Sequence, residues 1–326
     1  GWYNSGSVAN FSVTSPVDEG DGTRYLFTQW SGDFNGTSPS GSVTMNQPKE
    51  VVAGWKTQYY LTVTSSHDNP QGEGWYDSGS VANFSVTSPA DEGDGTRYVF
   101  TQWSGDYNGT DPSGSVTMSS AREVIANWKT QYYLTTSENP PEGGDITPSP
   151  PGGWYDSGSN VEINATVASG YQWAGWSGDL SGTTRPEHIT MTGPKEVIAN
   201  FGKLIQVTVQ TNPSGRQFEV DGTTYNSTQI FNWVENSQHT LSVSSPQAGA
   251  AGVQYVYSSW SDGGNQSHTY VVPGSDETVT ANFTTQYYLT VTSLHDNPQG
   301  EGWYNSGSVA NFSVTSPVDE GDGTRY

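Results

Sequence analysis

The stretch GWYNSGSVANFSVTSP at residues 1–16 returns at residues 74–89 as GWYDSGSVANFSVTSP, and again without a change at residues 302–317. More divergent copies, GWYDSGSNVEINATV and NWVENSQHTLSVSSP, begin at Gly153 and Asn232. The tryptophans of the five copies are Trp2, Trp75, Trp154, Trp233 and Trp303. Recurrence at intervals of 70 to 79 residues is typical of a tandem array of small structural units.

Within the clearest copy, apolar side chains alternate with polar ones in short runs, such as YYLTVT from Tyr59 and SVANFSV from Ser80. Clusters of Gly, Asn, Asp and Pro separate these runs, which is the pattern of β-strands joined by tight turns. We predict about six or seven strands and no helix in each complete unit. The alternation places Ala82, Phe84 and Val86 in the core, and Val81, Asn83 and Ser85 on the opposite face.

The predicted fold class is therefore all-β: a tandem array of modules of about 73 to 82 residues, each a small β-sandwich. An immunoglobulin-like topology is expected, with a β-grasp-like topology as the alternative. We expect Trp75, Trp103 and Trp128 to supply most of the buried area of the clearest module. The predicted modules are a partial one at 1–55, complete ones at 56–128 and 129–201, a divergent one at 202–283 and a partial one at 284–326.

Module junctions such as ANWKTQYYL contain no Pro-, Gly- or Ser-rich linker. The closing strand of one module runs directly into the opening strand of the next, so we expect a stiff rod rather than a flexible string. Because the two terminal modules are partial, we interpret the sequence as a window from a longer array.

Composition narrows the class of partner. Eleven Lys plus Arg against 33 Asp plus Glu give a net charge of −22, which repels nucleic-acid phosphates. No run of about 18 apolar residues occurs, so no membrane insertion is predicted for this segment. The absence of cysteine leaves the redox compartment undecided.

Catalytic residues are not predicted. His67 and His295 occupy the same turn position in two copies, while His188, His239 and His268 are scattered along the chain. There is no cysteine nucleophile, and no G-x-S-x-G sequence at a strand-to-helix turn. We therefore predict a protein without enzymatic activity and without a catalytic cofactor.

Acidic turns with the sequence DEGDG recur in three copies. Their carboxylates are Asp18, Glu19 and Asp21; Asp91, Glu92 and Asp94; and Asp319, Glu320 and Asp322. Carboxylate oxygens are the ligands that Ca²⁺ prefers, so these turns are a candidate calcium site. They lack the full twelve-residue calcium loop with its closing Glu, and the interpretation that we favour is a solvated acidic turn.

Asn-X-Ser/Thr sequences, the acceptors of N-linked glycans, occur at Asn10, Asn35, Asn83, Asn108, Asn164, Asn226, Asn265, Asn282 and Asn311. Several of them recur at equivalent positions, as Asn10 and Asn83 do on an outward strand face and Asn35 and Asn108 do in an NGT turn. Repeated placement favours glycosylation, which would also shield strand edges. The alternative, equally weighted, is that these are simply favourable turn and strand sequences.

Basic residues mark the junctions and the ends of the acidic turns. Lys56, Lys129 and Lys203 lie at junctions, and Arg24, Arg97 and Arg325 lie in TRY sequences. For the lysines we favour solvated charge over a salt bridge between modules. We expect the arginines either to neutralise the acidic turn or to stack on an aromatic ring.

The unit from Tyr132 to Phe201 resembles the divergent internalin B-repeat family of bacterial and archaeal surface proteins. Its most specific motifs are GGWYDSG at 152–158, GYQWAGWSGD at 170–179 and MTGPKEVIANF at 191–201. The first and second units keep GWY and QWSGD but have a longer turn, and the fourth unit departs further.

The resemblance implies tandem β modules on an extracellular or cell-surface protein, with an adhesive or structural role. We predict a structural segment of a long surface protein that forms a rod or filament, carries N-linked glycans and contacts itself or neighbouring repeats. The alternative is an adhesin stalk whose modules bind a glycan or another surface ligand on exposed aromatic rings.

Overall fold

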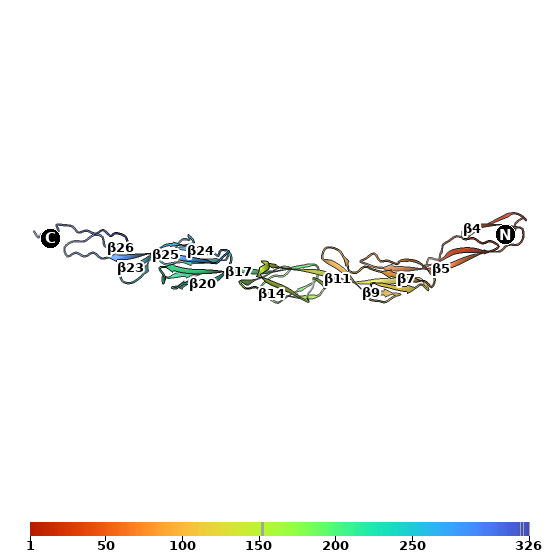
Figure 1. The fold of residues 1–326 in the computed structure, drawn as a ribbon, viewed down its shortest axis with the longest axis horizontal. Helices are drawn as coiled ribbons and strands as arrows, with labels where there is room; N and C mark the ends of the chain where they lie inside the picture. The colour runs from red at the N-terminus through yellow and green to blue at the C-terminus, as the bar shows by residue number, and fades with distance from the viewer. Residues whose placement is uncertain (151–152, 320, 322, 326) are drawn as a thin grey trace. The chain divides into compact units, whose positions relative to one another are not determined.

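The computed structural model describes residues 1–150, 153–319, 321 and 323–325, and in this range nearly all of the regular secondary structure is β-strand (Figure 1). The single helical turn among these residues is η1 (Pro141–Gly143). The all-β fold class is thus confirmed. In the same residues no helix is long and apolar enough to cross a membrane.

The strands follow the predicted repeats. The first module contains β1 (Val8–Ser12), β2 (Val17–Asp18), β3 (Thr23–Gly32), β4 (Ser40–Thr44) and the start of β5 (Val51–Thr64). The second adds β6 (Gly74–Asp77), β7 (Val81–Ser85), β8 (Ala90–Asp91), β9 (Thr96–Gly105), β10 (Ser113–Thr117) and the start of β11 (Arg122–Asn139).

The third module adds β12 (Gly144–Ser149), β13 (Trp154–Asp156), β14 (Asn160–Val167), β15 (Tyr171–Gly178), β16 (Glu187–Thr190) and the start of β17 (Lys195–Asn212). The fourth adds β18 (Phe218–Val220), β19 (Thr223–Tyr225), β20 (Gln229–Val234), β21 (Gln238–Ser242), β22 (Gln247–Ala248), β23 (Val253–Trp260), β24 (Ser267–Val271) and the start of β25 (Glu277–Leu289). The last strand is β26 (Gly302–Asn305).

The chain divides into two compact units. Unit 1 comprises Gly1–Thr136, Thr147–Ile163 and Pro186–Val197; unit 2 comprises Ser137–Ile146, Asn164–Arg185 and Ile198–Tyr326. The second module lies wholly in unit 1 and the fourth wholly in unit 2, so each is described within its own unit. The module boundaries drawn from the sequence remain a prediction.

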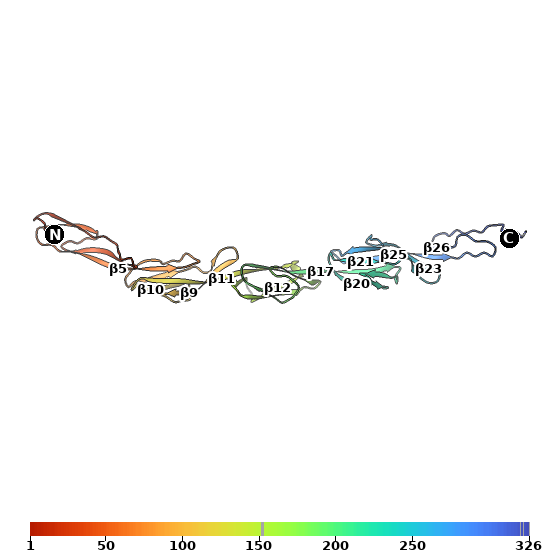
Figure 2. The same cartoon turned by 180° about the vertical axis from the view of Figure 1, so that it is seen from behind.

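The second module is a two-layer sandwich. One layer has the strand order β6, β5, β11, β9, β8, and the other consists of the antiparallel pair β7 and β10. Figure 1 labels β7 and β9, one strand from each layer, and Figure 2 labels β10 and β9 from behind. Strands β5 and β11 run parallel, with Leu61 opposite Arg122 and Thr64 opposite Ile125. Immunoglobulin sheets are antiparallel, so this parallel pair favours the β-grasp-like alternative.

The core of this module lies between the two layers. Ala82, Phe84 and Val86 are buried as the alternation predicts, and Val81 and Asn83 are exposed. Trp103 is also buried, and its Nε1 donates to the carbonyl of Asp111 at 3.1 Å. Trp75 and Trp128, by contrast, are only half-buried. They lie near the ends of the module, so the core depends more on aliphatic side chains than the sequence suggested.

The fourth module repeats the parallel pairing of its first and last strands. Strand β17 runs parallel to β25 from Val207 opposite Glu277 to Asn212 opposite Asn282. A second sheet has the order β19, β18, β21, β24. The core between them consists of Ile205, Val207, Val209, Phe218, Val220, Leu241, Val243, Trp260, Tyr270, Val272, Val279, Ala281 and Phe283.

Four long strands, β5, β11, β17 and β25, each close one module and open the next without interruption. The N-terminal half of β9 pairs with the part of β11 that belongs to the following module, up to Thr96 opposite Tyr132. A β-bulge shifts the register of this ladder between Asn127 and Trp128, at the predicted boundary. Bulges bend a strand and increase its twist, so the boundary is a bend in a continuous strand rather than a linker.

Candidate functional site

A cluster of five side chains joins the first module to the second, and we call it the junction cluster. Arg24 on β3 extends its guanidinium over the ring of Trp75 on β6, with Cζ 4.3 Å from the ring centroid. Its Nε donates to Gln58 Oε1 at 2.8 Å, and Gln58 Nε2 donates to Asp77 Oδ1 at 2.6 Å. Lys56 Nζ completes the cluster by donating to the second oxygen of Asp77 at 2.8 Å.

The same cluster recurs between the second and third modules. Arg97 lies 4.4 Å from the ring centroid of Trp154 and donates to Gln131 at 2.8 Å. Gln131 donates to Asp156 at 2.7 Å, and Lys129 donates to the other oxygen of Asp156 at 3.0 Å. Five residue types therefore recur with the same partners and nearly the same distances at two successive junctions.

The charged groups of these clusters orient the contact between modules more than they stabilise it. The hydrogen bond from Lys56, and then that from Gln58, lowers the pKa of Asp77; at the next junction Gln131 and then Lys129 lower the pKa of Asp156. The lysine and aspartate side chains are about half exposed, so each ion pair is worth well under about 1 kcal/mol. The arginine–tryptophan contact adds about 0.5 to 1 kcal/mol. The cluster therefore fixes the alignment of adjacent modules more than it stabilises either one.

The first two acidic turns each contact the module that follows them. In the first turn the carbonyl of Gly22 accepts a hydrogen bond from the backbone N–H of Tyr60 at 2.9 Å, and Gly95 does the same for Tyr133. A Cβ on Gly22 would lie 2.8 Å from the Cβ of Ala121, so the glycine permits this close approach. The turn thus provides a backbone contact at the junction.

The carboxylates of these turns close the turns themselves. Asp18 accepts from the N–H of Gly20 and Asp21 from that of Thr23, both at 2.9 Å. Asp91 and Asp94 make the equivalent bonds at 2.9 Å, and Asp319 accepts from Gly321 at 3.0 Å. Glu320 and Asp322 lie outside the described residues. No group of three metal-ligating side chains occurs among the residues that the structure does describe; calcium binding stays a prediction.

The basic residues divide between the roles that the sequence left open. Arg24 and Arg97 stack on aromatic rings, whereas Arg325 Nε lies 4.0 Å from Asp319 of its own acidic turn. Lys56 and Lys129 form half-exposed ion pairs with Asp77 and Asp156 of their own predicted modules, so neither pair is a salt bridge between modules. Lys203 instead donates to the carbonyl of Gly274 at 2.8 Å.

Sequence reasoning missed the roles of tryptophan and glutamine in the junction cluster. Trp75 was assigned to the core, and Gln58 was not singled out. One signal could have found them: the arginine and the glutamine are 34 residues apart at both junctions. Two residue types that recur at the same spacing on either side of a predicted boundary indicate a contact across that boundary.

Eight of the nine glycosylation candidates are exposed: Asn10, Asn35, Asn83, Asn108, Asn164, Asn226, Asn265 and Asn311. The ninth, Asn282, is half-buried, and its amide lies 3.4 Å from both Ser259 Oγ and the Asn212 side chain. A glycan at Asn282 would have to displace these contacts.

A shallow groove over β7 and β10 brings one candidate acceptor next to aromatic rings. Asn83 lies at this groove with Phe84 and Tyr107, whose ring centroids are 5.2 Å apart in an edge-on arrangement. Gly114 forms the floor, where a Cβ would approach Phe84 to 2.7 Å. The first module has an equivalent groove lined by Asn10, Phe11, Phe34 and Gly41. The same surface feature is therefore presented by two successive modules.

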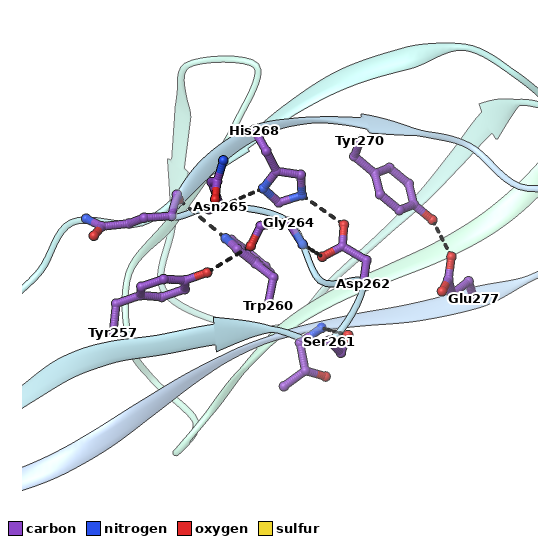
Figure 3. Close-up of polar contacts among 11 residues, drawn as sticks. Tyr257, Trp260, Ser261, Asp262, Gly264, Asn265, His268, Tyr270 and Glu277 are labelled. Carbon is purple, nitrogen blue, oxygen red and sulfur yellow. Dashed lines mark hydrogen bonds and ion pairs between the residues drawn. The ribbon is translucent and has the colours of Figure 1, made fainter.

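The fourth module has a polar cluster of its own (Figure 3). His268 Nε2 lies 2.8 Å from Asp262 Oδ2, and its Nδ1 lies 2.8 Å from the carbonyl of Asn265. Nearby, the Tyr270 hydroxyl donates to Glu277 at 2.8 Å; burial, and then this carboxylate, strongly raise the pKa of Tyr270. The histidine contacts tie the turn after β23 to strand β24, and the tyrosine contact ties β24 to the start of β25.

A second histidine of this module has the partners of a catalytic triad. Ser237 Oγ lies 3.0 Å from His239 Nε2, and His239 Nδ1 lies 2.8 Å from Asp221 Oδ2. The ring also stacks on Trp233, with centroids 3.9 Å apart. Ser237 and His239 are two residues apart, so their contact is local, and Asp221 also accepts from the N–H of Thr240 at 2.7 Å. The arrangement positions the histidine in the sheet, and no sequence motif indicated it.

Fold and junctions together define a class of protein: a tandem array of small β modules that share strands across their boundaries. The family described as divergent InlB B-repeat domain matches residues 3–58, 59–131 and 134–204, which is well over half of the chain. The chain therefore belongs to the divergent InlB B-repeat family.

A search of the curated proteins finds no match. Among solved structures, the chain is similar to the pilus adhesin SpaC from Lactobacillus rhamnosus GG, with 13% identity and a TM-score of 0.18. The similarity covers 85% of this chain and 43% of the adhesin chain, so the chain spans less than half the length of that protein.

Proposed function

We propose that the chain is a non-enzymatic, structural segment of an extracellular surface protein, in which successive modules form a stiff rod or fibre. The observation that carries the proposal is the junction: a strand that continues through the boundary, reinforced by the same five-residue cluster at two successive boundaries. A continuous strand cannot act as flexible coil. Membership of the repeat family supports placement on a cell surface.

The rod is tested by small-angle X-ray scattering of the chain and of a variant with six Gly and Ser residues inserted after Lys129. The parent chain is expected to scatter as a stiff rod, and the insertion is expected to broaden the distance distribution. Identical profiles would overturn the role of the junction. Surface placement is tested separately, by immunogold labelling of intact cells that carry the gene.

Two properties of the surface belong to this proposal. Glycans at the exposed sequons, Asn83 and Asn10 above all, would lie beside the aromatic groove and cover polar strand edges. Recurrence of one surface on successive modules also suits lateral self-association. Intact mass of the native protein, compared with that of an Asn83→Gln variant, tests glycosylation; a mass equal to the bare polypeptide in both would reject it.

The alternative is an adhesin stalk, and the groove favours it, because sugars stack on aromatic rings beside polar groups and the half-buried Tyr107 lies there with Asn83. Glycan-array binding of the chain tests this alternative. The double substitution Phe34→Ala and Tyr107→Ala, one in each groove, is expected to abolish any signal, while Tyr287→Ala, at an exposed tyrosine outside both grooves, serves as the control. Loss of signal in neither variant would reject the groove as the binding site.

A further inference from the structure

The chain enters and leaves each of two modules by neighbouring parallel strands. In the second module it enters along β5 and leaves along β11, and in the fourth it enters along β17 and leaves along β25. Tension along the chain therefore pulls β5 toward its N-terminus and β11 toward its C-terminus. Because the two strands point the same way, these pulls are opposed along their shared ladder, and its hydrogen bonds are loaded together in shear.

Packing opposes the same sliding movement. Leu61 and Val63 on β5, and Val124 and Ala126 on β11, are all buried in one core. Side chains alternate across a strand, so a slip of one residue would move an entire buried set to the other face. No neighbouring register is therefore available to relieve the load by a small displacement.

The fourth module has the longer parallel ladder. Six residue pairs join β17 and β25, compared with four pairs between β5 and β11. Two side-chain bonds cross the ladder as well, from Gln210 to Thr280 at 3.2 Å and from Asn212 to Asn282 at 3.4 Å. More bonds are loaded at once in this module.

We propose that these modules resist mechanical tension along the chain, and that this resistance resides in the parallel pairs β5–β11 and β17–β25. The fourth module is the stronger of the two. The mechanical resistance is a property of each single module. Only its biological use rests on the proposed surface role.

Single-molecule force spectroscopy on the full chain tests the proposal, and the absence of cysteine allows handles at chosen sites. A shear variant carries Val52→Cys and Thr135→Cys, which lie in β5 and β11 outside the parallel ladder. A control variant carries Thr64→Cys and Ile125→Cys, which lie opposite each other at the C-terminal end of the ladder and therefore load it across the strands, one bond after another. Val52, Thr64 and Thr135 are exposed and Ile125 is half-buried, and circular dichroism establishes that both variants fold.

The shear variant is expected to unfold at a force at least about twice that of the control at equal loading rate, because its ladder bonds break together. In the chain pulled by its ends, the longer extension of the 82-residue fourth module should appear at a higher force than that of the 73-residue second module. Equal forces in the two pulling geometries would overturn the proposal, and a weaker fourth module would overturn the ranking. A negative immunogold result would reject the surface role and leave this measurement unaffected.

Discussion

Arg97 shows how much of a junction depends on the shape of one side chain. Its planar guanidinium both covers Trp154 and donates through Nε to Gln131. Lysine keeps the charge but cannot reproduce this combination. Arg97→Lys is therefore expected to lower the free energy of unfolding by about 1 kcal/mol, measured by urea denaturation of residues 56–201.

The chain itself offers the control for this substitution. Arg122 pairs with Asp106 at 3.1 Å, and the first module has Lys49 paired with Asp33 at the equivalent place. Arg122→Lys is therefore expected to stay within about 0.5 kcal/mol of the parent. A loss for Arg97→Lys no larger than that for Arg122→Lys would show that the shape of the Arg97 guanidinium adds nothing to its charge.

Gly72 marks a second position where a single residue decides local structure. It has a φ of +99°, and a Cβ there would lie 2.1 Å from the carbonyl oxygen of Asn83. Gly72→Ala is expected to lower the free energy of unfolding by about 2 to 4 kcal/mol, because it adds backbone strain and forces β7 to shift. Gly79 has a φ of +82° with nothing near its Cβ position, so Gly79→Ala isolates the strain alone, about 1 kcal/mol. Equal thermal shifts for the two variants would contradict the steric argument.

The pH dependence of stability follows from the aspartates of the junction clusters. The pKa values of Asp77 and Asp156 are lowered below 3.8 in the folded chain by their hydrogen bonds to lysine and glutamine. Their stabilising contribution is thus fully present above about pH 4, and it is lost as the pH falls through the folded pKa. Asp156→Asn is expected to flatten the loss of melting temperature between about pH 4 and pH 2. If the melting temperatures of the parent chain and of the variant fall equally between about pH 4 and pH 2, this role of Asp156 is contradicted.

Strand β11 carries backbone pairing across the boundary that the repeats predict. Residues 129–132 belong to the third module by sequence, yet they pair with Thr96–Val99 of the second. A fragment of residues 56–128 leaves this half of β9 paired only with β8, whereas residues 56–158 retain its pairing with β11 and the junction cluster. The longer fragment is expected to melt at least about 5 °C higher by circular dichroism.

The two fragments share their N-terminus, so the comparison isolates the C-terminal boundary. A longer fragment that melts at the same temperature would show that the second module ends at Trp128 and that the pairing of β9 with residues 129–132 contributes nothing.

The strands, whose apolar and polar side chains alternate along the sequence, were predictable. The contacts between modules were not. Alternation in SVANFSV predicted the buried face correctly, because the burial of Ala82 and Phe84 depends only on which face of their own strand they occupy. The parallel pairing of β5 and β11 joins segments about 60 residues apart. Neither segment's own sequence shows whether its partner strand runs parallel or antiparallel to it. For the same reason the exposure of Asn83 followed from its strand, while the stacking of Arg24 on Trp75 required the fold.

At the scale of the whole chain, the net charge of −22 sets two salt effects against each other. Screening weakens the few lysine–aspartate pairs, each worth well under about 1 kcal/mol. It also weakens the repulsion among 33 acidic residues, which acts over a Debye length of about 30 Å at 0.01 M salt and about 10 Å at 0.1 M. Because the repulsive pairs far outnumber the attractive ones, sodium chloride is expected to raise the melting temperature of the chain between 10 and 200 mM, by about 2 to 5 °C.

Calcium chloride at matched ionic strength separates this general screening from a specific site. Without a site, the two salts give the same melting temperature, because the carboxylates of Asp18 and Asp21 stay bonded to their own turns. A calcium site on these turns would add a further rise that chelator removes and that Asp18→Asn and Asp91→Asn together abolish. A fall in melting temperature with sodium chloride would instead show that the ion pairs of the junction clusters outweigh the repulsion along the chain.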